Sequence, residues 1–415
     1  MAFRMDQLLR NLSRGLDYVE MERLGSATTN HGKRIAVMIS AMGRHLGWRD
    51  DQIVTAAACG LLHDNAIAES AAEFSSKKVS ARELIPHCII GEKNASSLPF
   101  PTHATDIIKY HHERMDKSGP FGINPEETPL AAQFIALADD LDLHHRPQGQ
   151  SASALADLRK VIMRKKGTYY SPCAADALLH VLNESLMRSL TDDKIDAAFA
   201  QAIPAWYVEI QTTESMGIAE TISRITDYKS SFTAKHSTQI ANRAHWMARF
   251  YGLETQECIK VYMAASLHDI GKLVTPIAIL EKPGKLTKDE FQVIKDHVYW
   301  SYMMLRDVEG LKEICRWAST HHRKLDGTGY PELPAEYLDL DFVSRLIACI
   351  DIYQAVRETR PYHPGRTHEE TMAILYSMAD KGEIDRQIVQ DMNTEMARFP
   401  GAEGDVPPPE KATPI

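Results

Sequence analysis

The sequence is poor in cysteine. Only six cysteines occur among 415 residues, and none of them form a CxxC pair. A disulfide framework or a cysteine-rich zinc site needs closely spaced cysteines, so we expect reduced core residues in a cytoplasmic protein. The amino-terminal segment is too polar for a signal peptide, and no run of about 18 apolar residues predicts a membrane span. A secreted, disulfide-bonded protein is therefore excluded.

The sequence also lacks an excess of basic residues. It has 47 lysines and arginines against 56 aspartates and glutamates, for a net charge of −9. Polymeric nucleic acid is bound through clustered basic side chains, so this charge argues against a general nucleic-acid-binding protein. A small anionic substrate held by metal ions and a few local cations remains compatible with it.

The alternating pattern of β-strands is scarce as well. Apolar residues instead recur at spacings of three and four, as at Ile240, Ala244, Met247 and Ala248, which predicts an all-α fold. A chain of this length exceeds one core, so two domains are expected. The ending FPGAEGDVPPPEKATPI has little apolar surface and predicts a flexible tail over residues 396–415.

A long internal repeat supports the division into two domains. The segment from His31 to His63 spans 63 − 31 = 32 residues, and that from His236 to His268 spans 268 − 236 = 32. The helical pattern between the histidines also matches. We therefore predict two related helical bundles, residues 1–150 and 221–395, joined by a helical connector over residues 151–220.

The second half carries a set of potential metal ligands on consecutive predicted helices. They are His236, His268, Asp269, His297, His321, His322 and Asp351. Five imidazoles and two carboxylates suit a pair of divalent ions about 3.5–4 Å apart. A closed structural zinc site needs only four ligands and usually employs cysteine. The set therefore predicts a dinuclear centre.

This half resembles the HD-GYP subgroup of the HD-domain metal-dependent phosphohydrolases over about residues 221–395. The resemblance rests on HDIGK at His268–Lys272, HHRKLDGTGYP at His321–Pro331, DIYQA from Asp351 and RPY at Arg360–Tyr362. It implies an all-helical fold with two or three iron or manganese ions. It also implies hydrolysis of a cyclic dinucleotide, cyclic di-GMP or 3′,3′-cyclic GMP-AMP, to a linear dinucleotide.

The resemblance also assigns roles by position. One ion would be held by His236, His268, Asp269 and Asp351, and the second by His297, His321 and His322, with Asp269 bridging. Such ions lower the pKa of a water molecule and supply hydroxide for attack on phosphorus. Lys272 would steady the scissile phosphate, and Arg360 would bind the substrate.

Four positions depart from the family pattern. Arg323 replaces the glutamate that usually follows the twin histidines, and Gln354 replaces the second aspartate of DxxDA. His363 replaces a lysine that often follows RPY. Phe232 stands where three-metal members carry a glutamate ligand, and because phenylalanine binds no metal we predict two ions.

The first half looks like an altered copy of the same domain. Its potential ligands are His31, His63, Asp64, His87, His111, His112 and Asp139. Ile67 occupies the position of Lys272, and GPF at residues 119–121 replaces GYP. Two interpretations compete: a degenerate domain that packs on the active half or senses a ligand, or a second, slower hydrolase. The missing lysine favours the first, and the sequence leaves metal binding open.

The leading hypothesis is therefore a cyclic-dinucleotide phosphodiesterase. The alternative is a catalytically weak module that binds a cyclic dinucleotide, motivated by the departures at Arg323, Gln354 and His363. A general HD phosphohydrolase is disfavoured because plain HD enzymes lack the GYP loop. The resemblance further implies association with a GGDEF cyclase through that loop, and a homodimer is a further expectation.

Overall fold

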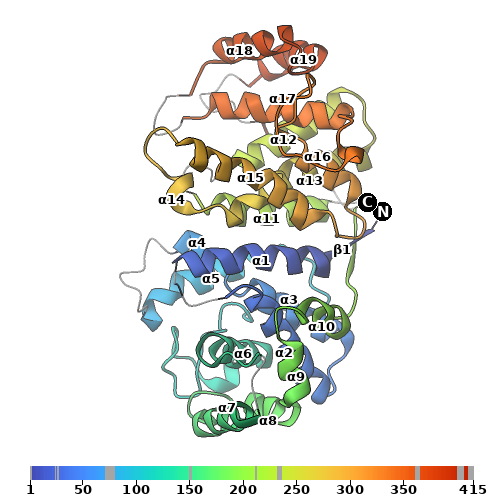
Figure 1. Cartoon of the computed structure of the whole chain (residues 1–415). Helices are drawn as coiled ribbons and strands as arrows, with labels where there is room; N and C mark the ends of the chain where they lie inside the picture. The colour runs from blue at the N-terminus through green and yellow to red at the C-terminus, as the bar shows by residue number, and fades with distance from the viewer. Residues whose placement is uncertain are drawn as a thin grey trace. The chain divides into compact units, whose positions relative to one another are not determined.

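The computed structural model describes residues 2–23, 25, 28–70, 80–148, 152–210, 213–230, 236–359, 365–399 and 406–409. Within these ranges the chain is helical apart from a sheet of two short strands, β1 (Ala2–Arg4) and β2 (Tyr207–Glu209) (Figure 1). The predicted all-α class is confirmed. The chain forms two compact units: the first unit is Arg4–Tyr207, and the second unit comprises Met1–Phe3 and Val208–Ile415.

The first unit is built around α2 (His31–His45). This helix is buried along most of its length and packs against α3 (Asp50–Leu62) and α6 (Leu130–His145). The other helices of this half are α1 (Met5–Arg23), α4 (Ile67–Ser70) and α5 (Ile85–Ala95).

The region predicted as a connector contributes to the same unit. It forms α7 (Ala152–Lys165), α8 (Pro172–Val181), α9 (Glu184–Ser189) and α10 (Ile195–Ala202). Both α8 and α10 pack on α2. Ser40 Oγ on α2 donates to the carbonyl of Ala202 at 2.8 Å, and Lys33 Nζ lies 2.7 Å from Asp196 Oδ1. These helices extend the first core, which corrects the expected boundaries at 150 and 220.

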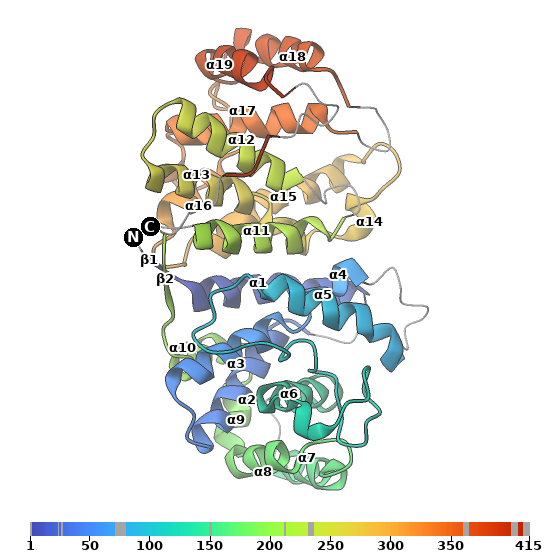
Figure 2. The same cartoon turned by 180° about the vertical axis from the view of Figure 1, so that it is seen from behind.

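The second unit repeats this arrangement around α12 (His236–Phe250). This helix packs on α13 (Thr255–Leu267) and α17 (Phe342–Arg357), as α2 packs on α3 and α6, and Figure 2 shows the three helices together from behind. The remaining helical elements are α11 (Thr213–Asp227), the 3₁₀ turn η4 (Ile270–Val274), α14 (Ile277–Leu280), α15 (Lys288–Leu305), α16 (Lys312–Ser319), the 3₁₀ turn η5 (Ala335–Tyr337), α18 (His368–Asp380) and α19 (Arg386–Met396).

Apolar periodicity explains why α12 has this position. Ile240, Ala244, Met247 and Ala248 lie on one face of the helix, and all four are fully buried. An apolar stripe of this kind drives a helix into a core. Because His236 is the first residue of α12, burying the helix also fixes where this histidine lies.

The predicted flexible tail is partly ordered. Val406 is only 1 % exposed, and its N–H donates to Gln239 Oε1 at 3.3 Å. Its carbonyl accepts a hydrogen bond from Asn242 Nδ2 at 3.2 Å. The described residues 406–409 therefore do not form a free tail at this point, because Val406 docks on α12. Among the helices of the described residues, none is both long and apolar enough to cross a membrane.

Candidate metal centre

The structure brings the predicted ligands of the second unit together from five parts of the chain. His236 begins α12, His268 and Asp269 follow α13, His297 lies on α15, His321 and His322 follow α16, and Asp351 lies on α17. Three overlapping groups have donor atoms within 4.8 Å of one another: His236, His268 and Asp351; His268, Asp269 and His321; and His297, His321 and His322. The groups share members, so they form one cluster.

Asp269 lies at the centre of this cluster. Its Oδ2 is 3.1 Å from His268 Nε2 and 3.7 Å from His236 Nε2, whereas its Oδ1 is 3.1 Å from His297 Nε2. The two oxygens of one carboxylate thus face two different sets of imidazoles. Asp351 also faces two ways, with Oδ1 3.6 Å from His236 Nε2 and Oδ2 3.4 Å from His322 Nδ1. This geometry suits two cations that share a carboxylate.

Backbone carbonyls orient three of the imidazoles. The Nδ1–H groups of His268, His297 and His321 donate to carbonyls three residues earlier, at 2.7, 2.5 and 2.7 Å. This leaves each Nε2 as a buried acceptor that has no hydrogen-bond partner among the residues the structure describes. A buried polar atom without a partner is costly, and a metal ligand commonly anchors its other ring nitrogen in this way. The residues therefore fit metal ions.

The pKa shifts of Asp269, His321 and His322 agree with that interpretation. Burial opposes ionisation of Asp269, but His268, Lys272 and His297 outweigh it and hold the carboxyl pKa well below its usual range. Burial and the neighbouring histidines lower the pKa of His321, and burial lowers that of His322 to about 4. Ionised carboxylates and neutral imidazoles are the forms that bind metals.

Glu358 is a candidate site residue that the sequence analysis missed. Its Oε1 accepts a hydrogen bond from His236 Nδ1 at 2.8 Å. Burial lowers the pKa of His236, but the carboxylates of Glu358 and Asp351 raise it by more than burial lowers it, to about 10. Glu358 also accepts from Gln354 Nε2 at 2.8 Å, while Gln354 Oε1 accepts from the buried Arg243. Gln354 departs from the DxxDA pattern and does not orient the imidazole of His236. Glu358, four residues later, does so instead.

In the first unit a single aspartate both orients the equivalent histidine and binds the equivalent arginine. Asp142 Oδ2 accepts from His31 Nδ1 at 2.8 Å, and Asp142 Oδ1 accepts from Arg34 Nε at 2.6 Å. Asp142 stands three residues after Asp139, as the second aspartate of DxxDA does. The first copy therefore keeps the second aspartate of the DxxDA pattern, which the second copy has replaced by Gln354.

Lys272 lies directly beside the shared carboxylate. Its Nζ forms an ion pair with Asp269 Oδ2. Gly271 allows this approach, because a Cβ there would lie 2.0 Å from the carbonyl oxygen of His297 and 2.5 Å from the N of Ser301. The glycine of HDIGK thus lets η4 pack tightly on α15, which places the lysine and His297 next to Asp269.

The loop after the twin histidines is closed by short contacts. Arg323 Nη1 donates to the carbonyl of Pro331 at 2.9 Å. Gly329 has a positive φ of 96°, and a Cβ there would lie 2.3 Å from the carbonyl oxygen of His322, so only glycine fits. The ring of Tyr330 lies 4.8 Å from that of His322. Arg323 therefore has a structural role in the loop, and Tyr330 borders the cluster.

Three residues from the sequence analysis cannot be placed. Arg360, expected to bind substrate, and His363, a departure from the family pattern, both lie outside the described residues. Phe232, on which the prediction of two ions was based, lies outside them as well. Their roles stay predictions.

The first unit assembles an equivalent cluster. Asp64 Oδ1 lies 3.1 Å from His87 Nε2 and 3.8 Å from His111 Nε2, and its Oδ2 lies 3.3 Å from His63 Nε2. Asp139 Oδ1 lies 3.2 Å from His31 Nε2. The groups with donor atoms within 4.8 Å are Asp64, His87, His111 and His112, and His31, His63 and Asp64. All seven candidates left open by the sequence thus meet.

A further carboxylate joins this first cluster. Glu20 on α1 is only 2 % exposed, and its Oε2 lies 3.8 Å from His31 Nε2. The sequence analysis missed this residue because α1 precedes the repeat. Burial and the nearby Asp64 raise the pKa of Glu20.

The chain matches two known family models. Both are described as the HD domain, and they match residues 28–143 and residues 220–388. The matches overlap the two clusters, from His31 to Asp139 and from His236 to Asp351.

Several curated proteins are similar to this chain. The 3′3′-cGAMP-specific phosphodiesterase 1 of Vibrio cholerae is 29% identical over 387 residues, which cover 91% of this chain and 88% of the relative. The 3′3′-cGAMP-specific phosphodiesterase 3 of the same organism is 28% identical over 71% of this chain and 64% of its own length. The cyclic di-GMP phosphodiesterase response regulator RpfG of Xanthomonas campestris is 34% identical over 38% of this chain and 43% of its own length.

One solved structure has the same fold over nearly the whole chain. It is a cyclic GMP-AMP-specific phosphodiesterase of V. cholerae, V-cGAP3, with a TM-score of 0.65 and 22% identity. The match covers 96% of this chain and 99% of that one.

Proposed function

The chain belongs to the HD-domain family, with two HD domains in tandem and homology to HD-GYP phosphodiesterases. From this we propose that its second unit is a metal-dependent enzyme that opens a cyclic dinucleotide to a linear one. The tandem arrangement predicted from the sequence repeat is thereby confirmed. The observation that carries the proposal is the position of Asp269, whose two oxygens face separate imidazole groups while Lys272 pairs with the same carboxylate.

The proposed catalytic domain is residues 221–395, and its centre would hold two divalent ions, iron or manganese. When bound, such ions lower the pKa of water and offset negative charge on phosphoryl oxygens. His236, His268 and Asp351 would hold one ion and His297, His321 and His322 the other, with Asp269 shared. The Lys272 ammonium lies where it would bind a phosphate oxygen and stabilise the charge that develops there. Arg360 would bind the rest of the substrate.

Among cyclic dinucleotides, we propose 3′,3′-cyclic GMP-AMP as the preferred substrate. Two relatives that match 91% and 71% of this chain, and so extend beyond the second HD domain, are named as specific for it. Relatives named cyclic di-GMP phosphodiesterases match only 38% and 45% of the chain. A third relative named as specific for 3′3′-cGAMP matches 42% of the chain, so the preference rests on the two longer matches.

The direct test is to incubate iron- or manganese-loaded protein anaerobically with each cyclic dinucleotide and to separate the products. We expect a linear dinucleotide, formed faster from cyclic GMP-AMP than from cyclic di-GMP. Consumption of neither compound by protein with a full metal content would refute the proposed activity. Faster consumption of cyclic di-GMP would refute only the preference.

The second candidate function is a weakly catalytic module that binds a cyclic dinucleotide. It is favoured by one observation: Gln354, a departure from the family pattern, does not bind His236 itself but hydrogen-bonds to Glu358, which does. Calorimetry distinguishes the two candidates, because tight binding without turnover supports the module.

Association with a GGDEF cyclase, and homodimer formation, remain part of the proposal. The GYP loop offers an exposed turn from Leu325 to Gly329 for such a contact. Co-purification with a GGDEF protein, lost after replacement of this turn by a glycine-serine loop, would support the first. Light scattering would test the second.

A further inference from the structure

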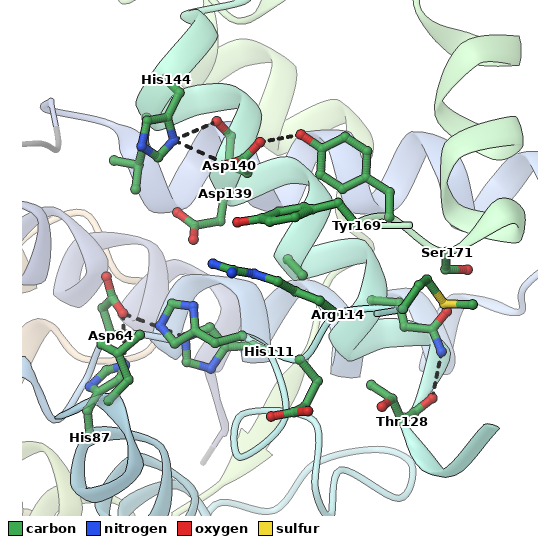
Figure 3. A pocket seen from close by; sticks show the side chains of 18 of the residues that line it. Asp64, His87, His111, Arg114, Thr128, Asp139, Asp140, His144, Tyr169 and Ser171 are labelled. Atoms are coloured by element: carbon green, nitrogen blue, oxygen red, sulfur yellow. Dashed lines mark hydrogen bonds and ion pairs between the residues drawn. The ribbon is translucent and has the colours of Figure 1, made fainter. Parts of the chain in front are cut away.

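A cavity of about 300 Å³ adjoins the metal-ligand cluster of the first unit. Asp64, His87 and Asp139 lie along one side of it, and Arg114 and Tyr169 lie along another (Figure 3). Figure 3 shows Arg114 beneath the Tyr169 ring, with its guanidinium directed toward Asp139 and His111. The cavity therefore combines potential metal ligands with a cation.

The cluster has the properties of a metal site. Within the described ranges, the Nε2 atoms of His31, His63, His87 and His111 are buried and have no hydrogen-bond partner. Carboxylates from Glu20, Asp64 and Asp139 lie among them. Three carboxylates and several imidazoles without partners would destabilise a buried region, and divalent cations satisfy both kinds of group.

The phosphate-handling cation of the second unit is missing here, because Ile67 stands at the position of Lys272. Arg114 offers a replacement from another element. Its guanidinium carbon lies 4.2 Å from the centroid of the Tyr169 ring, and its Nη1 donates to Ser118 Oγ at 3.3 Å.

The charge of Arg114 is available to a ligand. Within the described part of the chain it forms no ion pair, whereas Lys324, at the same distance after the twin histidines of the second unit, lies 2.7 Å from Glu383. A guanidinium of this kind binds a phosphate through two parallel hydrogen bonds.

We propose that the first unit is a metal-dependent binding site for a small phosphorylated ligand of nucleoside-monophosphate size. The phosphate would lie between the metal-ligand cluster and Arg114, and the rest of the ligand would lie toward Met115, Leu143 and Tyr169. A volume of about 300 Å³ is at the small end of ligand pockets, which fits one nucleotide better than a cyclic pair. This proposal does not depend on hydrolysis in the second unit.

Metal content tests the first half of this proposal. The full-length chain with His268→Ala and Asp269→Ala is loaded anaerobically with manganese, and bound metal is measured by mass spectrometry. We expect manganese to remain, and to be lost when His63→Ala and Asp64→Ala are added. Retention of no manganese by the His268→Ala and Asp269→Ala protein would overturn the site, whatever the activity of the wild-type enzyme.

GMP binding tests the second half in the same background. Calorimetry should show manganese-dependent binding of GMP that Arg114→Ala weakens by about tenfold or more, as expected for a lost charge-assisted pair. Manganese content should not change, and Arg164→Ala, an exposed arginine outside the cavity, should bind GMP normally. Equal GMP affinity with and without Arg114, or tighter binding of cyclic di-GMP than of GMP at this site, would overturn the proposed ligand.

Discussion

At the scale of single residues, Glu358 makes a contact in the candidate site that no sequence motif predicts. It lies 122 residues from His236 in sequence, yet it accepts the Nδ1–H of that imidazole. Motifs fix residues near one another along the chain, and this partner is set only when α12 packs on α17. The predicted ligands, which the fold brings together, were proposed from their motifs, whereas Glu358, Glu20 and Arg114 required the fold.

Replacing Glu358 should weaken metal binding without removing a ligand. Glu358→Gln leaves His236 with a neutral partner, so we expect metal affinity to fall by about 10- to 100-fold. Chelator competition measures this change, with the exposed Glu369→Gln as the matched control. Unchanged affinity in the Glu358 variant would mean that this glutamate does not orient the imidazole.

Replacing Lys272 should lower the rate of hydrolysis without changing the metal content. Lys272→Met removes the ammonium beside Asp269, and we expect turnover to fall by about 100- to 1,000-fold while two ions remain bound. Single-turnover kinetics and metal analysis of the same sample measure both quantities. The exposed Lys288→Met should behave like the wild type. Loss of metal together with turnover would instead make Lys272 a structural partner of Asp269.

His245 should contribute to acid sensitivity. It lies on α12 with its ring centroid 6.3 Å from that of Tyr262, and burial, with nearby Arg249, lowers its pKa to about 4. The unfolded chain takes up this proton near pH 6.5, so the neutral ring stabilises the fold above that pH and the contribution is lost toward pH 4.

Metal-free protein isolates this effect from the ligands. Between pH 7 and pH 5 the free energy of unfolding of His245→Gln should fall less than that of the wild type, by about 1 kcal/mol, because partial exposure screens the charge. Urea unfolding at the two pH values gives the difference, and the exposed His103→Gln serves as control. Parallel pH profiles for the wild type and His245→Gln would contradict the assignment.

At the scale of elements, both units pack the segment after the His-Asp pair closely against the helix that carries the next histidine. They place the small residue of this contact on different elements. In the second unit Gly271 packs against Ser301 on α15, whereas in the first unit Ala66 packs against Gly91 on α5, with 3.8 Å between the alanine Cβ and a Cβ built on the glycine. The glycine of the contact lies on η4 in the second unit and on α5 in the first unit. A Cβ on Gly91, four residues after His87, would also lie 3.1 Å from Ile108 Cγ2, which is the tighter of the two contacts.

Gly271 should therefore tolerate no larger side chain. Gly271→Ala places a Cβ against the backbone of His297 and Ser301, and we expect a loss of about 1–3 kcal/mol of stability together with reduced metal affinity. Thermal unfolding with and without manganese measures both. Gly217→Ala, on α11 with open space around it, should be neutral or slightly stabilising. A Gly271→Ala protein as stable as the wild type would refute the close-packing argument.

The helices themselves were predictable, but their partners were not. The apolar stripe of α12 correctly identified the buried face. The stripes of α7 to α10 likewise predict helices, but periodicity does not say which surface covers a stripe. These helices were therefore expected to link two domains, whereas α8 and α10 cover α2.

At the scale of the whole molecule, this packing predicts where the chain can be divided. A fragment of residues 2–207 should fold, because it contains α2 and the helices that cover it. A fragment ending at residue 150 exposes the apolar face of α2 and should aggregate. Circular dichroism and light scattering on the two fragments test this, and a soluble, helical 2–150 fragment would show that α8 and α10 are dispensable.

The docking of Val406 on α12 has a practical consequence for protein engineering. A polyhistidine purification tag fused directly after Phe399 would replace the residue that Gln239 and Asn242 hold, on the helix that begins with His236. Chelating imidazoles would then be tethered close to the predicted metal ligands of the second unit. A tag at the carboxyl end is better attached through a spacer that starts beyond residue 409 and is cleaved off before metal analysis.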